Sequence, residues 1–386
     1  MGYTVKDNVV WFDTATDVNA KIRNIGDVLS LATAGITTVK IAGKSRVLIK
    51  DADFANLCIL NYTHASLSAD DWTFLEYVSR GMIVNRRTGK IVSRPFDKFF
   101  NLPRDTRLDF NKVAEISEKM DGVMGSGYLH AGKWRVATRG SFSSREAKTG
   151  QRILDSKHDM KGWPANITPI WEIISPETHI VVDYADREEL VLIGARNFKT
   201  GKDLFLSREV TTLANNFGFT LPNFYSYSSL ESLKAVAARL SANREGFVVR
   251  MVDGTRWKVK GDAYLEKHRS LLSVTPKVVL SAMLSGTLDS FIEGQSEYYR
   301  IVANSYRDTI EDYIREQIEE ADKYKHLLEL PNYQFHTTVN GLKVSSLTAS
   351  VLKAMYQGQS SEKELQAAAF KDLQKRGWVK IRHIFN

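Results

Sequence analysis

Short apolar runs separated by turn residues fill the first part of the chain and predict strands rather than long helices. Such runs include VVWF, TTVKIAG and SRVLIKD, all within residues 9–51. Between Gly81 and Arg94 the apolar stretches MIV and IV flank NRRTGK, in which Gly89 can supply the turn. This segment therefore predicts a β-hairpin.

The segment that precedes the hairpin, SADDWTFLEYVSRG, predicts one helix over residues 68–81. Ser68 suits the N-cap, acidic residues follow in the first turn, and Gly81 comes after the expected end.

Residues 120–260 carry more strand patterns, such as VMGSGYLH, IWEII, ELVLIGARN, EGFVVRMV and RWKVKG. Two helical patterns interrupt them, at residues 207–218 and 229–242. Mixed strands with intervening helices predict an α+β fold of the kind that handles nucleotides.

The pattern changes near residues 266–275, where we place a domain boundary. From about Thr275 apolar residues recur at intervals of three and four, which is typical of helices. Ser361 precedes Glu364 by three residues and predicts a capping box at the start of another helix. We therefore expect domains at residues 1–268 and 269–386, the second all-helical.

Composition narrows the class of protein. The chain has 386 residues, 43% of them hydrophobic, which is ordinary for a globular protein. Its single cysteine, Cys58, excludes an internal disulfide and a cysteine zinc cluster and fits a reducing compartment. No apolar run approaches the roughly 18 residues that span a bilayer, and residues 1–30 show no secretory signal, so we expect a cytoplasmic protein without a membrane partner.

The net charge of +8 is unevenly distributed. From Ser270 onward 14 basic and 14 acidic residues cancel, so the whole excess lies in residues 1–269. A basic first part suits a polyanionic ligand such as a nucleotide or a nucleic acid, although charge that only keeps the protein soluble explains it equally well.

The first candidate for chemistry is the tetrapeptide Lys119-Met120-Asp121-Gly122. A lysine amine becomes a nucleophile when desolvation or neighbouring cations lower its pKa. Lys119 could then attack the α-phosphate of a nucleotide and release pyrophosphate, while Gly122 would let the backbone approach ribose and phosphate closely. The alternative is a solvated lysine beside a turn.

A second candidate is the pair Lys258 and Lys260, which alternate on a predicted strand and so share a face. Two ammonium groups on one face favour an anion between them, and triphosphate is the natural choice. Both could lower the pKa of Lys119 and neutralise the phosphoryl group in the transition state. A solvent-facing edge strand is the alternative.

Two acids on strands, Glu172 and Glu245, are flanked by apolar residues. Carboxylates in such places need a metal or a cation, and either could hold a hydrated Mg²⁺ or end in a salt bridge. Arg80 and Lys98 bracket the predicted hairpin and suit phosphate. The aromatic residues beside them, Phe96, Phe99 and Phe100, are expected in the core rather than at a base-stacking surface.

Taken in order, Arg80, Lys98, Lys119-x-Asp-Gly, Glu172, Glu245-Gly and Lys258-x-Lys260 resemble the covalent nucleotidyltransferase superfamily of ATP-dependent ligases and capping enzymes. Within it, the strings SRGMIV, SRPFDKFFN, EKMDG, WEIISPETHIV, EGFVVR and WKVKGDAYLEKH resemble RNA ligases of the phage T4 RNA ligase 1 type. They cover roughly residues 75–268.

The resemblance implies an α+β nucleotidyltransferase domain of mixed and antiparallel sheets, followed by a helical domain for RNA specificity. It implies that Lys119 takes AMP from ATP, passes it to a 5′-phosphate RNA end, and that a 3′-hydroxyl then seals the junction and releases AMP. Single-stranded RNA or cleaved tRNA ends in a phage-infected or microbial cell would be the substrates, and the protein would act as a monomer.

The resemblance also assigns roles. Arg80 and Lys98 would contact ATP phosphates or RNA ends. Glu172 and Glu245 would serve the ribose or a hydrated Mg²⁺, which Mn²⁺ could replace. The α-phosphate would be oriented by Lys258 and Lys260. Cofactor contacts would also include Asp121, Gly122 and, through its backbone near the adenine, Glu118.

Some features depart from the pattern. The string VLIGARN lacks an aromatic residue that could stack on adenine. Arg139 and Ser141 fit a phosphate or ribose contact as well as a plain turn. The basic segment 371–385, with Trp378, suits either RNA ends or a packing helix.

Three alternatives stay open on sequence alone: a DNA ligase, an RNA-capping guanylyltransferase, and a non-catalytic RNA-binding module. The helical pattern after Lys260 argues against the first two, because it leaves no room for a five-stranded OB-fold.

Overall fold

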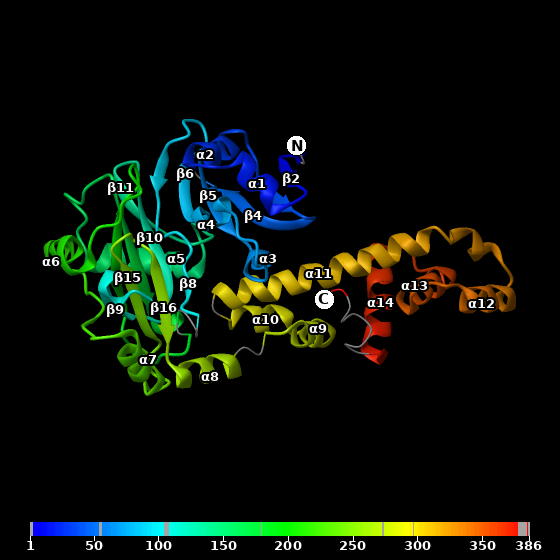
Figure 1. Cartoon of the computed structure of the whole chain (residues 1–386). Coiled ribbons are helices and arrows are strands. Elements are labelled where there is room, and N and C mark those ends of the chain that lie inside the picture. The colour runs from blue at the N-terminus through cyan, green and yellow to red at the C-terminus, as the bar shows by residue number, and fades with distance from the viewer. Residues whose placement is uncertain are drawn as a thin grey trace. The chain divides into compact units, whose positions relative to one another are not determined.

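The computed structural model describes residues 3–53, 56–103, 108–178, 180–271, 274–295, 297–376 and residue 384. It divides into one unit of residues 1–271 and a second of residues 272–386 (Figure 1). The first unit contains three sheets and the second, where described, only helices. The expected α+β fold class with a helical carboxyl-terminal part is confirmed.

The first sheet has seven strands in the order of the sequence. Its strands pair antiparallel except for the parallel pair β2–β3. The strands are β1 (Tyr3–Lys6), β2 (Val9–Phe12), β3 (Thr38–Ile41), β4 (Lys44–Asp51), β5 (Leu57–Tyr62), β6 (Arg80–Asn85) and β7 (Ile91–Ser93). Helices α1 (Ala15–Lys21) and α2 (Ile25–Thr33) supply apolar residues to the core of this sheet. The predicted hairpin is confirmed as β6–β7, with Gly89 at φ +65°.

The single helix expected over residues 68–81 is wrong. Two short helices, α3 (His64–Leu67) and α4 (Phe74–Val78), replace it. Thr73, not Ser68, caps α4: its hydroxyl accepts a hydrogen bond from the Glu76 N–H, and the Glu76 carboxylate accepts one from the Thr73 N–H. The chain leaves α4 early because pairing with β5 already begins at Arg80.

Two further sheets form the rest of the first unit (Figure 1). The four-stranded sheet is antiparallel and runs β11 (Lys133–Thr138), β10 (Val123–His130), β12 (Ile167–Ile174) and β13 (Glu189–Asn197). The five-stranded sheet runs β14 (Phe224–Tyr225), β9 (Val113–Lys119), β15 (Gly246–Met251), β16 (Arg256–Lys260) and β8 (Phe100–Asn101), with only β16–β8 parallel.

Each of these two sheets has its own apolar core. Trp171 and Ile173 are fully buried in the core that α5 (Arg145–Lys157) and α6 (Thr211–Phe217) share with the four-stranded sheet. The five-stranded sheet buries Phe247 against α7 (Leu230–Ala238). The remaining elements of this unit are the single turns η1 (Phe110–Lys112), η2 (Pro176–Thr178) and η3 (Leu206–Val210), and helix α8 (Asp262–Leu271).

One short loop connects the two sheets. β9 ends at Lys119 and β10 begins at Val123, so the tetrapeptide Lys119–Gly122 is the crossover between them. The lysine therefore belongs to one sheet, and the glycine lies against the other.

The second unit consists of α9 (Pro276–Ser285), α10 (Leu288–Glu293), α11 (Glu297–Asp322), η4 (Lys325–Glu329), α12 (Asn332–Gly341), α13 (Ser346–Tyr356) and α14 (Glu362–Arg376). Buried leucines from α13 and α14, Leu352 and Leu373, contribute to its packing. The Ser361–Glu364 capping box is present. Trp378 lies outside the described residues. None of the described helices combines the length and apolarity required to cross a bilayer.

A buried ion pair joins α4 to the first sheet and yields a stability prediction. The Arg46 guanidinium donates to fully buried Glu76 at 2.6 Å and also to exposed Asp71 at 3.0 Å. Replacing Glu76 with alanine leaves Arg46 buried without its main partner and removes a helix cap. We expect a loss of about 3–5 kcal/mol in the free energy of unfolding, measured by urea denaturation.

Asp71→Ala is the matched control, because it removes the exposed partner of the same arginine. It should change stability by no more than about 1 kcal/mol. Equal losses in the two variants would contradict the role given to Glu76.

Candidate functional site

Strand register brings Lys119, Glu245 and Lys260 together. Gly246 at the start of β15 pairs with Lys119 on one side and with Lys260 on the other, and Glu245 immediately precedes it. The Glu245 carboxylate accepts from Lys119 Nζ at 2.6 Å through Oε2 and pairs with Lys260 Nζ at 2.9 Å through Oε1. We call these three residues the lysine–glutamate triad.

Gly246 is required for this geometry. Its φ is +139°, and a Cβ atom there would come within 2.1 Å of the Val259 carbonyl oxygen. A side chain at this position would therefore push β15 and β16 apart just where the triad forms.

The expectation that neighbouring lysines lower the pKa of Lys119 is wrong for the protein without ligand. Burial of the amine acts to lower the pKa of Lys119, but the carboxylates of Glu245 and Glu172 outweigh it and the pKa is raised. Glu245 is 4% exposed, and its own pKa is lowered: burial opposes this, while Lys119 and Lys260 prevail. The protein without ligand thus holds Lys119 as an ammonium ion.

The lysine with a depressed pKa is Lys258. Burial, reinforced by the charges of Lys119, Arg80 and Lys98, holds the pKa of Lys258 well below its ordinary value. Among the described residues no carboxylate lies within ion-pair distance of it, and its Nζ is 4.8 Å from the centre of the Phe99 ring. A bound anion would therefore favour the charged form of the Lys258 amine.

Glu172 lies on β12 and accepts a hydrogen bond from the Gly122 N–H at 3.0 Å. Burial and the negative charge of Glu245 raise the pKa of Glu172 to about 7, although the positive charge of Lys119 acts to lower it. The structure gives Gly122 a role other than approach to a ligand: a Cβ there would lie 2.4 Å from the Ile173 carbonyl oxygen and 3.1 Å from Glu172 Cγ.

Asp121 fixes the crossover loop. Its buried carboxylate accepts from the N–H groups of Val181 and Val182 at 2.9 and 2.8 Å and from the Tyr264 hydroxyl at 2.8 Å. The Asp121 N–H in turn donates to the Tyr184 hydroxyl at 2.9 Å. These contacts position the backbone that joins Lys119 to Gly122.

A second group of cations lies beyond Lys258. Arg80, Lys98 and Arg139, which we call the cationic cluster, surround the hydroxyl of Tyr62; Arg139 donates to it at 2.7 Å and Lys98 at 3.4 Å. Burial acts to raise the pKa of Tyr62, yet the three cations lower it to about 7. The cluster therefore favours negative charge.

The sequence singled out Arg80 and Lys98 as residues that bracket the hairpin, and the structure brings both to the hydroxyl of Tyr62, which the sequence did not indicate. The only hint of its role is a polar end on an otherwise apolar strand. Arg139, for which a plain turn was an equal alternative, belongs to this cluster. Its neighbour Ser141 instead caps the following turn, where its hydroxyl accepts from the N–H groups of Ser143 and Ser144.

The three phenylalanines beside Arg80 and Lys98 differ in burial. Phe96 is 6% exposed, as expected for the core. Phe99 and Phe100 are only partly buried and lie beneath cations: Arg80 and Lys258 approach the Phe99 ring, and Lys98 approaches the Phe100 ring at 5.1 Å. Their assignment to the core is thus incomplete.

The side chain of Glu118 contacts neither lysine of the triad. It accepts from Asn223 Nδ2 at 2.6 Å and lies 3.6 Å from Arg244 Nε, while its N–H donates to the Asn223 carbonyl.

The two acids expected at a metal differ in what they can offer. Both oxygens of Glu245 pair with lysines, whereas one oxygen of Glu172 accepts only from the Gly122 N–H and the other accepts no hydrogen bond from the described residues. In the described residues no group of three or more His, Cys, Asp or Glu side chains could hold a metal alone. Glu172 fits a magnesium ion that keeps most of its waters and binds substrate phosphates.

Comparison with known proteins gives consistent results. Residues 78–265 match the profile of a family of RNA ligases. A protein of Thermovibrio ammonificans named as an RNA ligase is 31% identical over 203 residues, which are 49% of this chain and 52% of that protein. A protein of Autographa californica nuclear polyhedrosis virus named as a bifunctional polynucleotide kinase/RNA ligase is 28% identical over 68% of this chain and 40% of its own.

This chain therefore spans about half the length of these relatives or less. Among solved structures, an RNA ligase of Naegleria gruberi with ATP and Mn matches 40% of this chain and 51% of that chain at 22% identity, with a TM-score of 0.35.

The raised pKa of Glu172 predicts how stability depends on pH. The folded protein binds a proton on Glu172 up to about pH 7, whereas the unfolded chain loses it near the ordinary value of 4.5. Stability from this group is thus full below pH 4.5 and is lost as pH rises to 7. Glu172→Gln cannot ionise, and at pH 8 it should exceed wild type by up to about 3 kcal/mol.

Urea denaturation at several pH values from 5 to 8 measures this difference. Gln retains an oxygen that can accept from the Gly122 N–H, so the two proteins differ in the ionisation of residue 172 and not in this hydrogen bond. A stability difference that stays constant over this pH range would contradict the assignment.

Proposed function

We propose that the chain belongs to the T4 RNA ligase 1 family and that it is an ATP-dependent RNA ligase, which joins 5′-phosphate and 3′-hydroxyl ends through enzyme–AMP and RNA–adenylate. The single observation that carries this proposal is the lysine–glutamate triad, buried beside Lys258, for which the described residues offer no carboxylate partner. A non-catalytic RNA-binding module has no use for such an arrangement.

In the first step the Lys119 amine, once deprotonated, forms a bond to the α-phosphorus of ATP. The bond from that phosphorus to the bridging oxygen breaks, and pyrophosphate leaves. Glu245 is the group at hydrogen-bond distance that can accept the proton. Until the nucleotide binds, the same carboxylate holds the amine charged and in place.

Lys258 and the cationic cluster supply the charge that a triphosphate needs. Lys258 is influenced by both Lys119 and the cluster, so it lies between the α-phosphate and the outer phosphates in this proposal. Because the cationic cluster is already in place and partly buried, it stabilises the charge that develops in the transition state without reorganisation. Lys258 adds its charge once phosphate binding favours its protonated form.

Glu172 would hold the hydrated Mg²⁺ or Mn²⁺, which neutralises phosphate charge when bound. With its pKa near 7, Glu172 would ionise as the cation arrives. The same carboxylate also keeps the crossover loop in position through the Gly122 N–H.

The later steps transfer AMP to the RNA 5′-phosphate and then release it when the 3′-hydroxyl attacks. We propose single-stranded RNA or cleaved tRNA ends as substrates, recognised with the help of the helical unit, by a monomer that acts in the cytoplasm. Compared with a DNA ligase or a capping enzyme, this is favoured by the helices that follow β16 and by the absence of a strand in the described residues beyond it.

Enzyme–AMP formation tests the nucleophile. Wild-type protein incubated with ATP and Mg²⁺ should gain the mass of one AMP, stable to denaturation, and Lys119→Ala should gain none because the proposal makes the Lys119 amine the nucleophile. Intact-protein mass spectrometry measures both.

Lys133→Ala, which removes an exposed lysine on β11, is the control and should behave as wild type. Equal adduct on wild type and Lys119→Ala would remove Lys119 from the mechanism. Absence of any adduct, with RNA binding retained, would favour a non-catalytic module.

The lowered pKa of Lys258 predicts that phosphate binding takes up a proton. A bound anion favours the charged amine, so pyrophosphate affinity should fall as pH rises above the lowered pKa of Lys258. Lys258→Met should bind about tenfold more weakly and show less proton uptake, because a charged hydrogen bond contributes roughly 1.5–3 kcal/mol. Calorimetry in buffers of different ionisation enthalpy measures the protons.

Tyr62 titrates near pH 7 and acts in the same direction, since its phenolate would repel phosphate. Tyr62→Phe therefore separates the two contributions. Unchanged proton uptake in Lys258→Met would contradict the assignment.

A further inference from the structure

The chemistry of the proposed function determines the side from which the RNA end must enter. In an in-line displacement at phosphorus the attacking and leaving atoms lie on opposite sides. In the first step Lys119 attacks opposite the pyrophosphate. In the second, an oxygen of the RNA 5′-phosphate bonds to the same phosphorus, the bond from Lys119 nitrogen breaks, and the amine regains a proton. The 5′-phosphate must therefore occupy the position that pyrophosphate has left.

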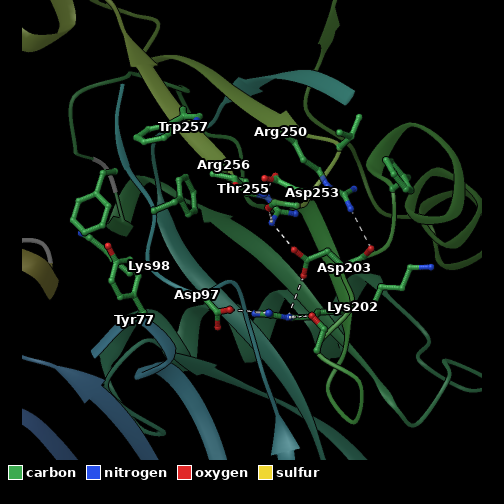
Figure 2. Close-up of a pocket in the computed structure, with 17 residues that line it drawn as sticks. Tyr77, Asp97, Lys98, Lys202, Asp203, Arg250, Asp253, Thr255, Arg256 and Trp257 are labelled. Carbon is green, nitrogen blue, oxygen red and sulfur yellow. Dashed lines mark hydrogen bonds and ion pairs between the residues drawn. The ribbon is translucent and has the colours of Figure 1, made fainter. Parts of the chain in front are cut away.

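The proposed function leaves unused a cavity beside the cationic cluster, with which it shares Lys98. A cavity of 610 Å³ opens beside Lys98, which belongs to the cationic cluster and also lines the cavity wall (Figure 2). Its other walls come from the β15–β16 hairpin, the end of β13 and the residues that follow it. This volume is in the range of small-molecule sites and is large enough for one nucleoside.

The charges of the cavity suit a nucleic acid. Five cations and three acids line it. Arg196 donates to Asp97 at 2.8 Å and pairs with Asp203 at 3.2 Å, and Arg256 also pairs with Asp203. These pairs make a fixed polar wall. Lys98 and Lys202 have no acidic partner within ion-pair distance among the described residues, so the wall has positive charge to offer.

An exposed aromatic ring lies next to the phosphate position. Tyr77 is 37% exposed, lines the cavity, and meets Trp72 and Phe100 only by tilted or edge contacts at 5.7 and 5.8 Å. The backbone N–H of Lys98 donates to the Tyr77 carbonyl at 2.8 Å (Figure 2). Lys98 Nζ lies 5.1 Å from the centre of the Phe100 ring, which the Tyr77 ring also contacts. A base attached to a phosphate at Lys98 would reach this ring.

We propose that this cavity binds the 5′-terminal nucleoside of the donor RNA strand, with its base stacked on Tyr77. The inference rests on the proposed function and adds the place of the donor nucleotide. Positive charge combined with an aromatic platform is the arrangement by which proteins hold single-stranded nucleic acid without reading its sequence.

The test uses enzyme that has first been converted to enzyme–AMP, mixed with 5′-phosphorylated RNA, and followed for RNA–adenylate in a single turnover. The enzyme–AMP yield shows that each variant is folded. Tyr77→Leu should slow RNA–adenylate formation about tenfold at subsaturating RNA, the effect of losing one stacked base. Tyr77→Phe retains the ring and should restore the rate.

Trp11→Leu is the matched control, because Trp11 is 38% exposed on β2 and does not line the cavity. A donor whose first nucleotide lacks a base should react slowly with wild type and equally slowly with Tyr77→Leu, since both changes remove the same stack.

Three results would overturn the inference. Equal rates for wild type and Tyr77→Leu on the intact donor would remove Tyr77. A second test measures the sealing of pre-adenylated RNA to an acceptor that lacks the base of its 3′-terminal nucleotide. If this missing base slows the wild type and Tyr77→Leu equally, the cavity binds the acceptor instead. Enzyme that never takes up AMP would instead contradict the proposed function itself, and the inference with it.

Discussion

The Glu245 carboxylate lies between two ammonium groups, and the arrangement of the site depends on this contact. It is 4% exposed and pairs with Lys119 and Lys260 through different oxygens. A buried carboxylate without these partners would be strongly unfavourable, and so would either amine without the carboxylate. One acid shared by two lysines leaves the pocket with an excess of positive charge, which the phosphates of a nucleotide can neutralise.

The charge states of Glu172 and Lys258 follow from that balance. Glu172 is held back from ionising by burial and by Glu245, while Lys258 is held back from protonation by burial and by the other cations. In the free protein, the environment thus favours the neutral form of both Glu172 and Lys258. Under the proposed function, a metal–nucleotide complex would bring charge of both signs and would favour the charged form of both groups.

Backbone constraints keep these groups in register. Gly246 allows β15 and β16 to close directly beside Glu245, and Gly122 allows the crossover loop to lie on β12 beneath Glu172. Asp121 binds that loop to the backbone at residues 181–182 and to α8 through Tyr264. From this fixed point the cations continue through Lys258 and Lys98 to the cavity at Tyr77, so that nucleotide and RNA end can share one line of positive charge.

The sequence by itself determined the class of fold, the strands that carry Glu172 and Lys258, and the strand that follows Glu245, because hydrophobic alternation and residue spacing are local properties. It also identified the change to helices after β16. It did not predict β9, the strand that ends at Lys119.

Tertiary structure decided what each group experiences. Lys119 is held charged rather than neutral because Glu245, 126 residues away, lies closer to it than any cation that could lower its pKa. Tyr62 lies in the cationic cluster because it contacts Lys98 and Arg139, which are 36 and 77 positions away in the sequence. The single helix predicted over residues 68–81 does not form, because Glu76 pairs with Arg46 of β4 and Arg80 pairs with β5 at the start of β6. Burial and charge are summed over neighbours in space, and a linear pattern does not contain those neighbours.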